Sequence, residues 1–517
     1  MKKHIYLKRG IAALVAGASV LCLAACGGGG DKTSDGELTY WVKINGNIAT
    51  SVANYAETVF AQEYMKRTGV KVVYEHPAQG QEKEALNLLL ASGSLPDIIE
   101  TDWITRNPDS MIAQNVIVPL NDIIDKSAPN LKKYFEENPD IAIAAKTDSG
   151  QYYAFPFVRN GDKLLNVSGF YMRGDWLKEL GLEAPETLDE WETVLTAFKE
   201  KKGATGVIVT GSKSLLNLSS GYGIDDAFYV EDGVVKYGMI DSRFGEFLGR
   251  MNRWYETGLI DKNVPTMEGK YANACMLDGR AGVSFGAGGS GMGVLLTTAK
   301  ANGDNNYSLA AVKAPAETKG AIPKFSNREL KLSDKGAAAI TSSCKDPELA
   351  AKFLDFSYSE EGSMLNNFGI EGDSYTMVDG NPIYTEKITN DPNGLTMAQA
   401  MGIYVRSCGE GPFIQDERYI EQYYPTDDQR NALNVWSVNE TDKRQMPLIT
   451  LTAEEQSEYS KIMTDFETFR NESIIAFIMG TRSTDDYDTF IKECKDRGIE
   501  RAIEIYQKAY DRYMNRK

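Results

Sequence analysis

The stretch Leu38-Thr39-Tyr40-Trp41-Val42 is a predicted β-strand, and it opens an alternation of strands and helices. Apolar residues at helical spacing follow this strand as far as Gly69, where glycine favours a helix end. A second strand is predicted over Val70 to Tyr74, a second helix over about Gln81 to Ala91, and a third strand over Asp97 to Glu100. Strands separated by helices usually pair in parallel through crossover connections, so this pattern predicts an α/β fold.

Open sheets of this kind bind ligands beyond the carboxyl ends of their strands. That rule selects Trp41, Lys43, Asp102 and Trp103, which end or follow the predicted strands. Trp103 lies outside any helical apolar stripe, so we predict that it stacks on a ligand. Trp254, in contrast, belongs to an apolar helical stripe and is predicted to lie in the core.

Composition narrows the class of protein. The 517 residues are 42% apolar and 25% charged, which is typical of a soluble globular protein, and the length suits two or three domains of roughly 150 residues each. Acidic residues exceed basic ones by 73 to 56, and the formal charge of −17 disfavours a broad nucleic-acid surface. The chain has only two histidines, His4 and His76, which leaves little room for zinc sites, proton relays or Ser-His-Asp triads.

The N-terminus has the order of an export signal. Positive residues precede an apolar stretch, Ile11 to Leu23, that is too short to span a membrane as a helix. The sequence Leu23-Ala24-Ala25-Cys26 then resembles a bacterial lipobox, which implies that residues 1–25 are a lipoprotein signal peptide and that Cys26 carries the lipid. Residues 26–36, rich in glycine, would form a flexible tether. A cleaved signal with a chance cysteine is the alternative.

The remaining cysteines give little information. Their spacings match no metal-binding pattern, and three disulfide pairings are possible among Cys275, Cys344, Cys408 and Cys494. We expect buried free thiols, and the sequence does not choose among the pairings.

A series of short motifs, in order along the chain, carries a family resemblance. They are Gly93-Ser94-Leu95-Pro96-Asp97-Ile98, Gly150-Gln151-Tyr152-Tyr153-Ala154-Phe155-Pro156, Tyr171-Met172-Arg173-Gly174-Asp175-Trp176-Leu177, Gly258-Leu259-Ile260-Asp261, Lys345-Asp346-Pro347-Glu348-Leu349-Ala350, Tyr358-Ser359-Glu360-Glu361-Gly362 and Gly369-Ile370-Glu371-Gly372-Asp373-Ser374-Tyr375. Together they resemble the family 1 extracellular solute-binding proteins, the substrate receptors of sugar ABC importers. The C-terminal motifs, such as Phe477-Ile478-Met479-Gly480-Thr481, are similar to the long LipO-like subgroup, which handles oligosaccharides.

The resemblance implies a two-lobe, type II periplasmic-binding-protein-like α/β fold with hinge crossovers and a largely helical C-terminal part. The lobes would close like a hinge on a ligand held between them. By this resemblance lobe 1 combines residues 37–155 and 282–340, lobe 2 combines residues 160–280 and 345–517, and the chain crosses near 156–171, 279–286 and 338–344.

The function implied is a lipid-anchored receptor that faces the outside of the cell membrane, or the periplasm where an outer membrane exists. It would capture an oligosaccharide and deliver it to ABC transporter permease subunits, without enzymatic activity. Sugar recognition needs aromatic faces and a few oriented polar groups. The predicted ligand-binding residues are Trp41, Asp102, Trp103, Tyr153, Phe155, Arg159, Tyr171, Phe285, Glu371 and Tyr375. Glu371 lies between two glycines and has a structural alternative, because a carboxylate there can simply tie a turn together.

Two features argue against cofactors. Gly286-Ala287-Gly288-Gly289-Ser290-Gly291 spells the dinucleotide pattern, but the next predicted strand, Tyr307 to Val312, lacks a following acidic residue for ribose. We interpret the glycines as letting backbone approach a ligand. Relatives often carry an acidic calcium-binding loop after the helix that ends here at Phe198, whereas Lys199 to Gly206 contains one carboxylate and three lysines. We therefore expect no calcium site and no other metal.

The main alternative is a surface glycoside hydrolase with paired carboxylates. The acidic pairs Asp225-Asp226 and Asp427-Asp428 consist of adjacent residues, which normally point apart, whereas the chemistry needs two carboxylates held about 5 to 10 Å apart by different elements. The sequence does not identify the sugar, its linkage or its length. The negative net charge argues against strongly anionic polyuronates, although Arg159, Arg106 and Lys43 could compensate locally.

Overall fold

A six-stranded mixed sheet organises lobe 1, in the order β13-β4-β10-β3-β1-β2. The structure, a computed structural model, describes residues 36–49 and 51–516, so the predicted signal peptide and Cys26 lie outside the described residues. The strands are β1 (Glu37–Trp41), β2 (Lys71–Glu75), β3 (Ile98–Thr101), β4 (Phe155–Asn160), β10 (Leu332–Ile340) and β13 (Ile414–Asp416). Strands β1, β2 and β3 pair in parallel, as the sequence predicts, while β10 runs antiparallel to both β3 and β4.

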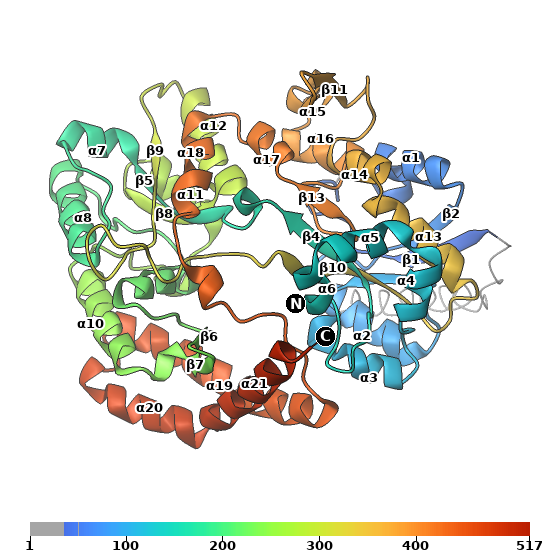
Figure 1. The fold of residues 1–517 in the computed structure, drawn as a ribbon. Coiled ribbons are helices and arrows are strands. Elements are labelled where there is room, and N and C mark those ends of the chain that lie inside the picture. The colour runs from blue at the N-terminus through green and yellow to red at the C-terminus, as the bar shows by residue number, and fades with distance from the viewer. Residues whose placement is uncertain (1–35, 50, 517) are drawn as a thin grey trace, which may run out of the picture.

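Helices cover both faces of this sheet (Figure 1). They are α1 (Val59–Thr68), α2 (Glu82–Ser92), α3 (Pro108–Ala113), α4 (Asn121–Ser127), α5 (Pro129–Glu137), α6 (Pro139–Ala144), α13 (Pro347–Asp355) and α14 (Glu360–Asn367). A separate hydrophobic cluster joins α15 (Glu386–Thr389), α16 (Met397–Tyr404) and α17 (Arg418–Tyr423) to the hairpin β11 (Tyr375–Val378) and β12 (Asn381–Tyr384). The predicted helix ends are present, since Gly69 and Gly93 close α1 and α2 with positive φ angles of 69° each.

Lobe 2 is built on a three-stranded antiparallel sheet of order β8-β5-β9. Its strands are β5 (Ser168–Arg173), β8 (Val283–Ala287) and β9 (Leu309–Val312), and the lobe also contains a separate hairpin of β6 (Phe228–Glu231) and β7 (Val234–Tyr237). Its helices are α7 (Gly174–Leu180), α8 (Leu188–Lys202), α9 (Ser212–Leu215), α10 (Ser242–Glu256), α11 (Gly269–Leu277), α12 (Val294–Ala301), α18 (Asp427–Trp436), α19 (Ala453–Met479), α20 (Tyr487–Asp496) and α21 (Ile499–Met514). Trp254 is fully buried in the core of this lobe, as predicted.

The lobe boundaries differ from those expected for residues 282–340. Strands β8 and β9 hydrogen-bond to β5 in lobe 2, in registers that place Phe285 opposite Phe170 and Ala311 opposite Tyr171. Only β10 from this range joins the lobe 1 sheet. The chain therefore crosses between lobes after β4 and again between β9 and β10, and no crossing lies near residues 279–286.

The expected assignment of all of 345–517 to lobe 2 is also corrected. Helix α13 packs in the lobe 1 core, where the Tyr64 hydroxyl donates to the Phe353 carbonyl at 2.8 Å and the Asp355 carboxylate accepts from the Leu131 N–H at 2.8 Å. The chain returns to lobe 2 only between β13 and α18. These partners come from distant parts of the chain, so local sequence patterns carry no signal for them.

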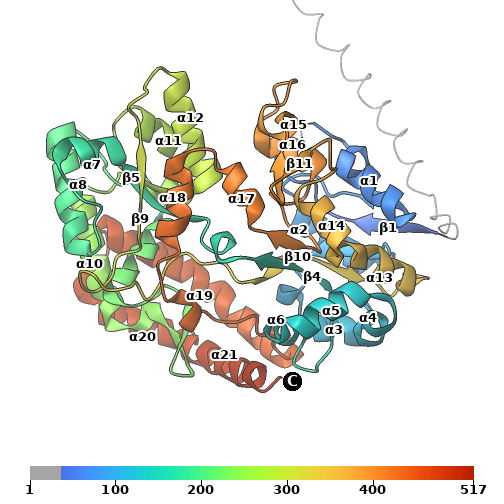
Figure 2. The same ribbon diagram turned by 45° about the horizontal axis from the view of Figure 1, so that its top comes forward.

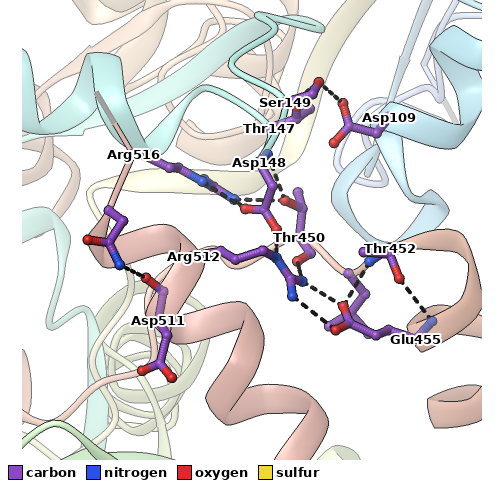
Figure 3. A network of polar contacts seen from close by, with 12 residues as sticks. Asp109, Thr147, Asp148, Ser149, Thr450, Thr452, Glu455, Asp511, Arg512 and Arg516 are labelled. Carbon is purple, nitrogen blue, oxygen red and sulfur yellow. Dashed lines mark hydrogen bonds and ion pairs between the residues drawn. The ribbon is translucent and has the colours of Figure 1, made fainter.

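A partly buried polar network ties the C-terminal end of the chain to lobe 1 (Figure 3). In two views α21 ends beside α6 (Figures 1 and 2). There Asp148 accepts from Arg512 and from Arg516 at 2.6 Å each, and Arg512 also donates to Glu455 at 2.6 Å. The Arg516 side chain is only 3% exposed and also donates to the Thr450 hydroxyl at 2.7 Å. The two lobes are thus joined by a non-covalent contact in addition to their crossovers.

All four cysteines in the described residues are free thiols, three of them buried. No helix among residues 36–49 and 51–516 combines the length and apolar character needed to cross a membrane.

Candidate ligand-binding site

Two adjacent cavities lie at the carboxyl edge of the lobe 1 sheet. Because β10 is antiparallel to both β3 and β4, these two strands run in the same direction, and the carboxyl end of β4 leads into the crossover toward lobe 2. The cavities at this edge measure about 510 and 480 Å³. The first cavity includes Leu164 and Val167 of the crossover, and both cavities share Lys43, Glu82, Glu100 and Glu410. The cavities therefore lie where the sequence predicts a ligand site, beyond the carboxyl ends of the strands.

A buried ion pair forms the floor of the first cavity. The Arg406 guanidinium donates to both carboxylate oxygens of Glu100, at 3.1 and 2.7 Å, and their side chains are only 13% and 4% exposed. The Tyr40 hydroxyl donates to the same carboxylate at 2.7 Å, and Arg406 also donates to the Glu410 carbonyl at 2.6 Å. Burial alone would lower the pKa of Arg406, but the neighbouring Glu100 outweighs it and the net shift is upward. This side chain stays charged and fixed in place.

An ion pair between Lys43 and Glu410 lies where the two cavities meet. The Lys43 Nζ atom is 2.9 Å from the Glu410 carboxylate, and the lysine side chain is 55% exposed. Burial works against the charge of Lys43, yet the hydrogen bond from Lys43 to Glu410 gives a net rise of its pKa. A partly exposed pair of this kind can exchange its partner for ligand hydroxyls at small cost.

The rest of the first cavity offers aromatic and amide groups. Burial raises the pKa of Tyr55 to about 12, so its hydroxyl is neutral at physiological pH. The Gln415 amide donates to the Ser407 carbonyl at 2.6 Å and to the Tyr419 hydroxyl at 3.1 Å. Arg159 lies over the Phe157 ring at 5.2 Å and donates to the Leu330 carbonyl at 3.1 Å. Such oriented donors and acceptors beside apolar faces suit a polyhydroxylated ligand.

The structure brings together three of the ten predicted ligand-binding residues. Trp41 and Asp102 line the second cavity and Arg159 lines the first. Tyr153, Phe155 and Tyr171 are buried in the hydrophobic cores, and Phe285 packs edge-on against Phe170 in lobe 2.

Glu371 and Tyr375 lie elsewhere. They line a separate surface groove with Arg67 and Phe356, and neither belongs to the lining of the two edge cavities. The main chains of Glu371 and Tyr375 form a β-bridge to each other, so both residues belong to one turn, and the role of the Glu371 carboxylate stays a prediction.

The placement of Trp103 does not fit the predicted stacking role. Its side chain is fully buried in the cluster beneath the second cavity, beside Trp41 and Leu86. The indole N–H donates to the Ile99 carbonyl at 3.1 Å, so the polar atom is satisfied within the core. A side chain without exposed surface offers no face to a sugar ring, and we now assign Trp103 a structural role.

The sequence reasoning missed Tyr55, Arg406, Glu410 and Gln415. Arg406 and Glu410 lie on a loop with no hydrophobic period, which local patterns do not reveal. A glycine in this loop, Gly411, is a signal that the sequence does offer, and the structure explains it: its φ is 153°, and a Cβ there would lie 2.4 Å from the Arg406 guanidinium.

The glycine-rich run 286–291 has a structural explanation. A Cβ on Gly288 would lie 2.5 Å from the Tyr424 ring, and one on Gly289 would lie 2.6 Å from the Tyr423 ring. The glycines thus admit side chains of the same protein, and the interpretation as a backbone surface for ligand is replaced.

The family follows from comparison with known proteins. Residues 49–364, more than half of the chain, match the family described as bacterial extracellular solute-binding protein. The chain belongs to this family. The solute-binding protein is 27% identical over 492 residues to the fructooligosaccharide ABC transporter substrate-binding protein FusA of Streptococcus pneumoniae serotype 4, covering 89% of this chain and 88% of FusA. It is 23% identical over 371 residues to lipoprotein LipO of Bacillus subtilis strain 168, covering 68% and 71% of the two chains.

Solved structures agree on the fold of this solute-binding protein. The crystal structure of alginate-binding protein AlgQ2 without calcium ion has a TM-score of 0.74 at 26% identity, covering 92% of this chain and 98% of AlgQ2. FusA in complex with kestose has a TM-score of 0.73 at 24% identity, covering 93% and 99% of the two chains. The two-lobe type II fold expected from the sequence is confirmed.

Proposed function

We propose that this solute-binding protein captures an oligosaccharide at the carboxyl edge of lobe 1 and delivers it to the permease of an ABC transporter. The near full-length similarity to FusA, whose name states a fructooligosaccharide substrate, is the observation that carries the proposal. The two edge cavities support it, because they combine oriented polar groups with the Trp41 side chain.

Within this site we propose contacts from Trp41, Asp102 and Arg159, joined by Lys43 and Gln415. Sugar hydroxyls pair with carboxylates, amides and cations, while the C–H face of a ring packs on an aromatic side chain. Lobe 2 would close over the bound sugar about the crossovers, which lie beside the first cavity.

A thermal-shift screen with a panel of oligosaccharides tests the proposal. A ligand at 100 times its Kd adds about 2.7 kcal/mol to the folded state, so a true ligand raises Tm. Small-angle scattering should then show a smaller radius of gyration on saturation. Arg159→Gln should weaken binding, whereas Glu371→Gln, in the separate groove, should not. A panel that produces no shift contradicts the proposal, and an unchanged radius at saturation argues for a rigid site.

We propose that the protein has no enzymatic activity. Neither Asp225-Asp226 nor Asp427-Asp428 lines either cavity at the sheet edge. Incubation with a bound oligosaccharide, followed by product analysis, should return the sugar intact, and cleavage would favour the glycoside hydrolase alternative.

We further propose that Cys26 carries a lipid and anchors the protein outside the cell membrane. The lipobox-like sequence and the similarity to a named lipoprotein, LipO, support this. Cys26→Ala should move the protein out of the membrane fraction, and a variant that stays firmly bound would contradict the assignment.

We propose that no calcium is needed for folding or binding, because the Lys199 to Gly206 loop is poor in carboxylates.

A further inference from the structure

The second cavity contains an arginine, Arg106, that forms no ion pair within 4.0 Å with a described carboxylate, although the charge of Asp102 acts on it from a longer distance. Arg106 lines this cavity, is partly buried, and donates one guanidinium hydrogen bond, at 3.0 Å, to the Asn87 side-chain oxygen. Among the arginines of the described residues, only Arg106, Arg253 and Arg470 form no ion pair within 4.0 Å. Of these three, Arg106 alone lines a cavity at the sheet edge.

Burial of this guanidinium is energetically unfavourable in the unliganded protein. Burial lowers the pKa of Arg106, and the carboxylate of Asp102 offsets that effect only in part. At the neighbouring cavity the pKa of Arg406 is raised instead, because Glu100 accepts hydrogen bonds from it directly and outweighs the effect of burial. Arg106 therefore has hydrogen-bonding capacity left for an anion.

Two further cations line the same cavity. Lys83 and Lys335 are exposed, and neither forms an ion pair with a described carboxylate. The cavity does hold four carboxylates, but each already accepts from protein donors. Glu410 pairs with Lys43, Glu100 with Arg406, Glu82 accepts from the Gly80 N–H at 2.9 Å, and Asp102 accepts from the Thr105 hydroxyl at 3.0 Å.

An apolar surface lies beside these charges. Trp41, the last residue of β1, and Leu86 of α2 line the second cavity with Arg106. An aromatic ring next to a guanidinium fork suits a sugar that presents a C–H face and a planar carboxylate together. Arginine binds carboxylates through two parallel hydrogen bonds, a geometry that a neutral hydroxymethyl group cannot reproduce.

We propose that the second cavity binds a carboxylate-bearing sugar unit, so that the ligand of this protein is an oligosaccharide containing uronic acid. Arg106 is the specificity-determining residue, with Lys83 and Lys335 as supporting charges. This inference rests on the proposed function, because it names the substrate class of the same site. The negative net charge of the protein opposes the long-range approach of such a ligand. The cavity lining itself has four cations and four carboxylates, so the attraction must come from short-range contact with Arg106, Lys83 and Lys335.

Calorimetric titration with matched sugars tests the inference. The probes are trigalacturonate and trimannuronate, each compared with its carboxyl-reduced neutral counterpart, which keeps the ring and the linkage. We expect at least one uronide to bind about tenfold or more tighter than its counterpart, the range of a charge-assisted hydrogen bond. Arg106→Gln should remove most of that preference, and it should weaken binding of the neutral sugar far less than binding of the uronide.

Arg253→Gln is the matched control, because Arg253 also lacks an ion pair but lies on an exposed groove of lobe 2. It should bind like the unmodified protein. Binding of neutral oligosaccharides without any preference for a uronide overturns the inference and leaves the proposed function standing. An equal loss for charged and neutral sugars in Arg106→Gln also overturns it, since Arg106 would then only shape the cavity. Failure of every oligosaccharide to bind refutes the proposed function itself.

Discussion

Substitution of Arg406 by Met should destabilise lobe 1 strongly. The change keeps an unbranched side chain but removes both hydrogen bonds to Glu100, whose side chain is 4% exposed. Among the residues that the structure describes, only the Tyr40 hydroxyl then remains as a side-chain donor to that carboxylate. Breaking a buried ion pair from one side typically costs about 3 to 5 kcal/mol, because the remaining charge is left uncompensated. Urea unfolding followed by circular dichroism and fluorescence measures the loss and checks whether the two probes coincide.

The double variant Arg406→Met/Glu100→Met separates the charge effect from simple loss of packing. Replacing both partners of a buried pair with apolar residues is often close to neutral, so most of the stability should return. A deficit of about 1 to 3 kcal/mol should remain, because the buried Tyr40 hydroxyl loses its acceptor. Addition of Tyr40→Phe should reduce that remainder.

A surface pair serves as the control. Arg418 binds Asp416 with comparable geometry, but the arginine side chain is 43% exposed. Arg418→Met should therefore change the free energy of unfolding by no more than about 1 kcal/mol. The reasoning is refuted if the double variant is no more stable than Arg406→Met, because Glu100 would then not be the source of the instability.

Three further predictions concern stability. Trp103→Ala and Trp254→Ala should each cost about 3 to 5 kcal/mol in urea unfolding, because both side chains are fully buried, and a loss below about 1 kcal/mol would contradict a core position. Incubation with EDTA should leave Tm unchanged, since the Lys199 to Gly206 loop has one carboxylate, and a lower Tm would reveal a metal site. Burial raises the pKa of Glu455, but hydrogen bonds from Arg512 outweigh this and give a net lowering. The stability that this carboxylate contributes is therefore complete above its unfolded pKa of about 4.3 and is lost as the pH falls through the lower folded value. Glu455→Gln should flatten that part of the Tm against pH curve, and an unaltered curve would exclude the contribution.

The sequence predicted the first three strands to within one residue at each end. Leu38 to Val42, Val70 to Tyr74 and Asp97 to Glu100 correspond to β1, β2 and β3. Local signals are sufficient here, because apolar spacing and the left-handed glycines that close α1 and α2 depend only on nearby residues.

The lobe to which a strand belongs, and the partners of several site residues, are decided by contacts between distant parts of the chain. Nothing within residues 283–312 indicates that β5, rather than the lobe 1 sheet, is their pairing partner. Likewise Arg406 meets Glu100 only after a separation of 306 residues, so neither could be identified as a partner of the other. For Trp103 the sequence wrongly predicted a ligand contact. A tryptophan that follows a strand can turn into the core, and packing with distant residues decides whether it is exposed.

The position of β10 between β3 and β4 sets the order in which the chain can fold. These two strands have no direct ladder with each other, and β10 follows the whole β5-β8-β9 sheet in the chain. A chain that emerges N-terminus first must therefore hold two unpaired strand edges until β10 arrives. High contact order of this kind slows folding and favours aggregation before completion. Because each lobe is assembled from separate segments of the chain, neither lobe corresponds to one continuous stretch of sequence that could fold as soon as it is synthesised.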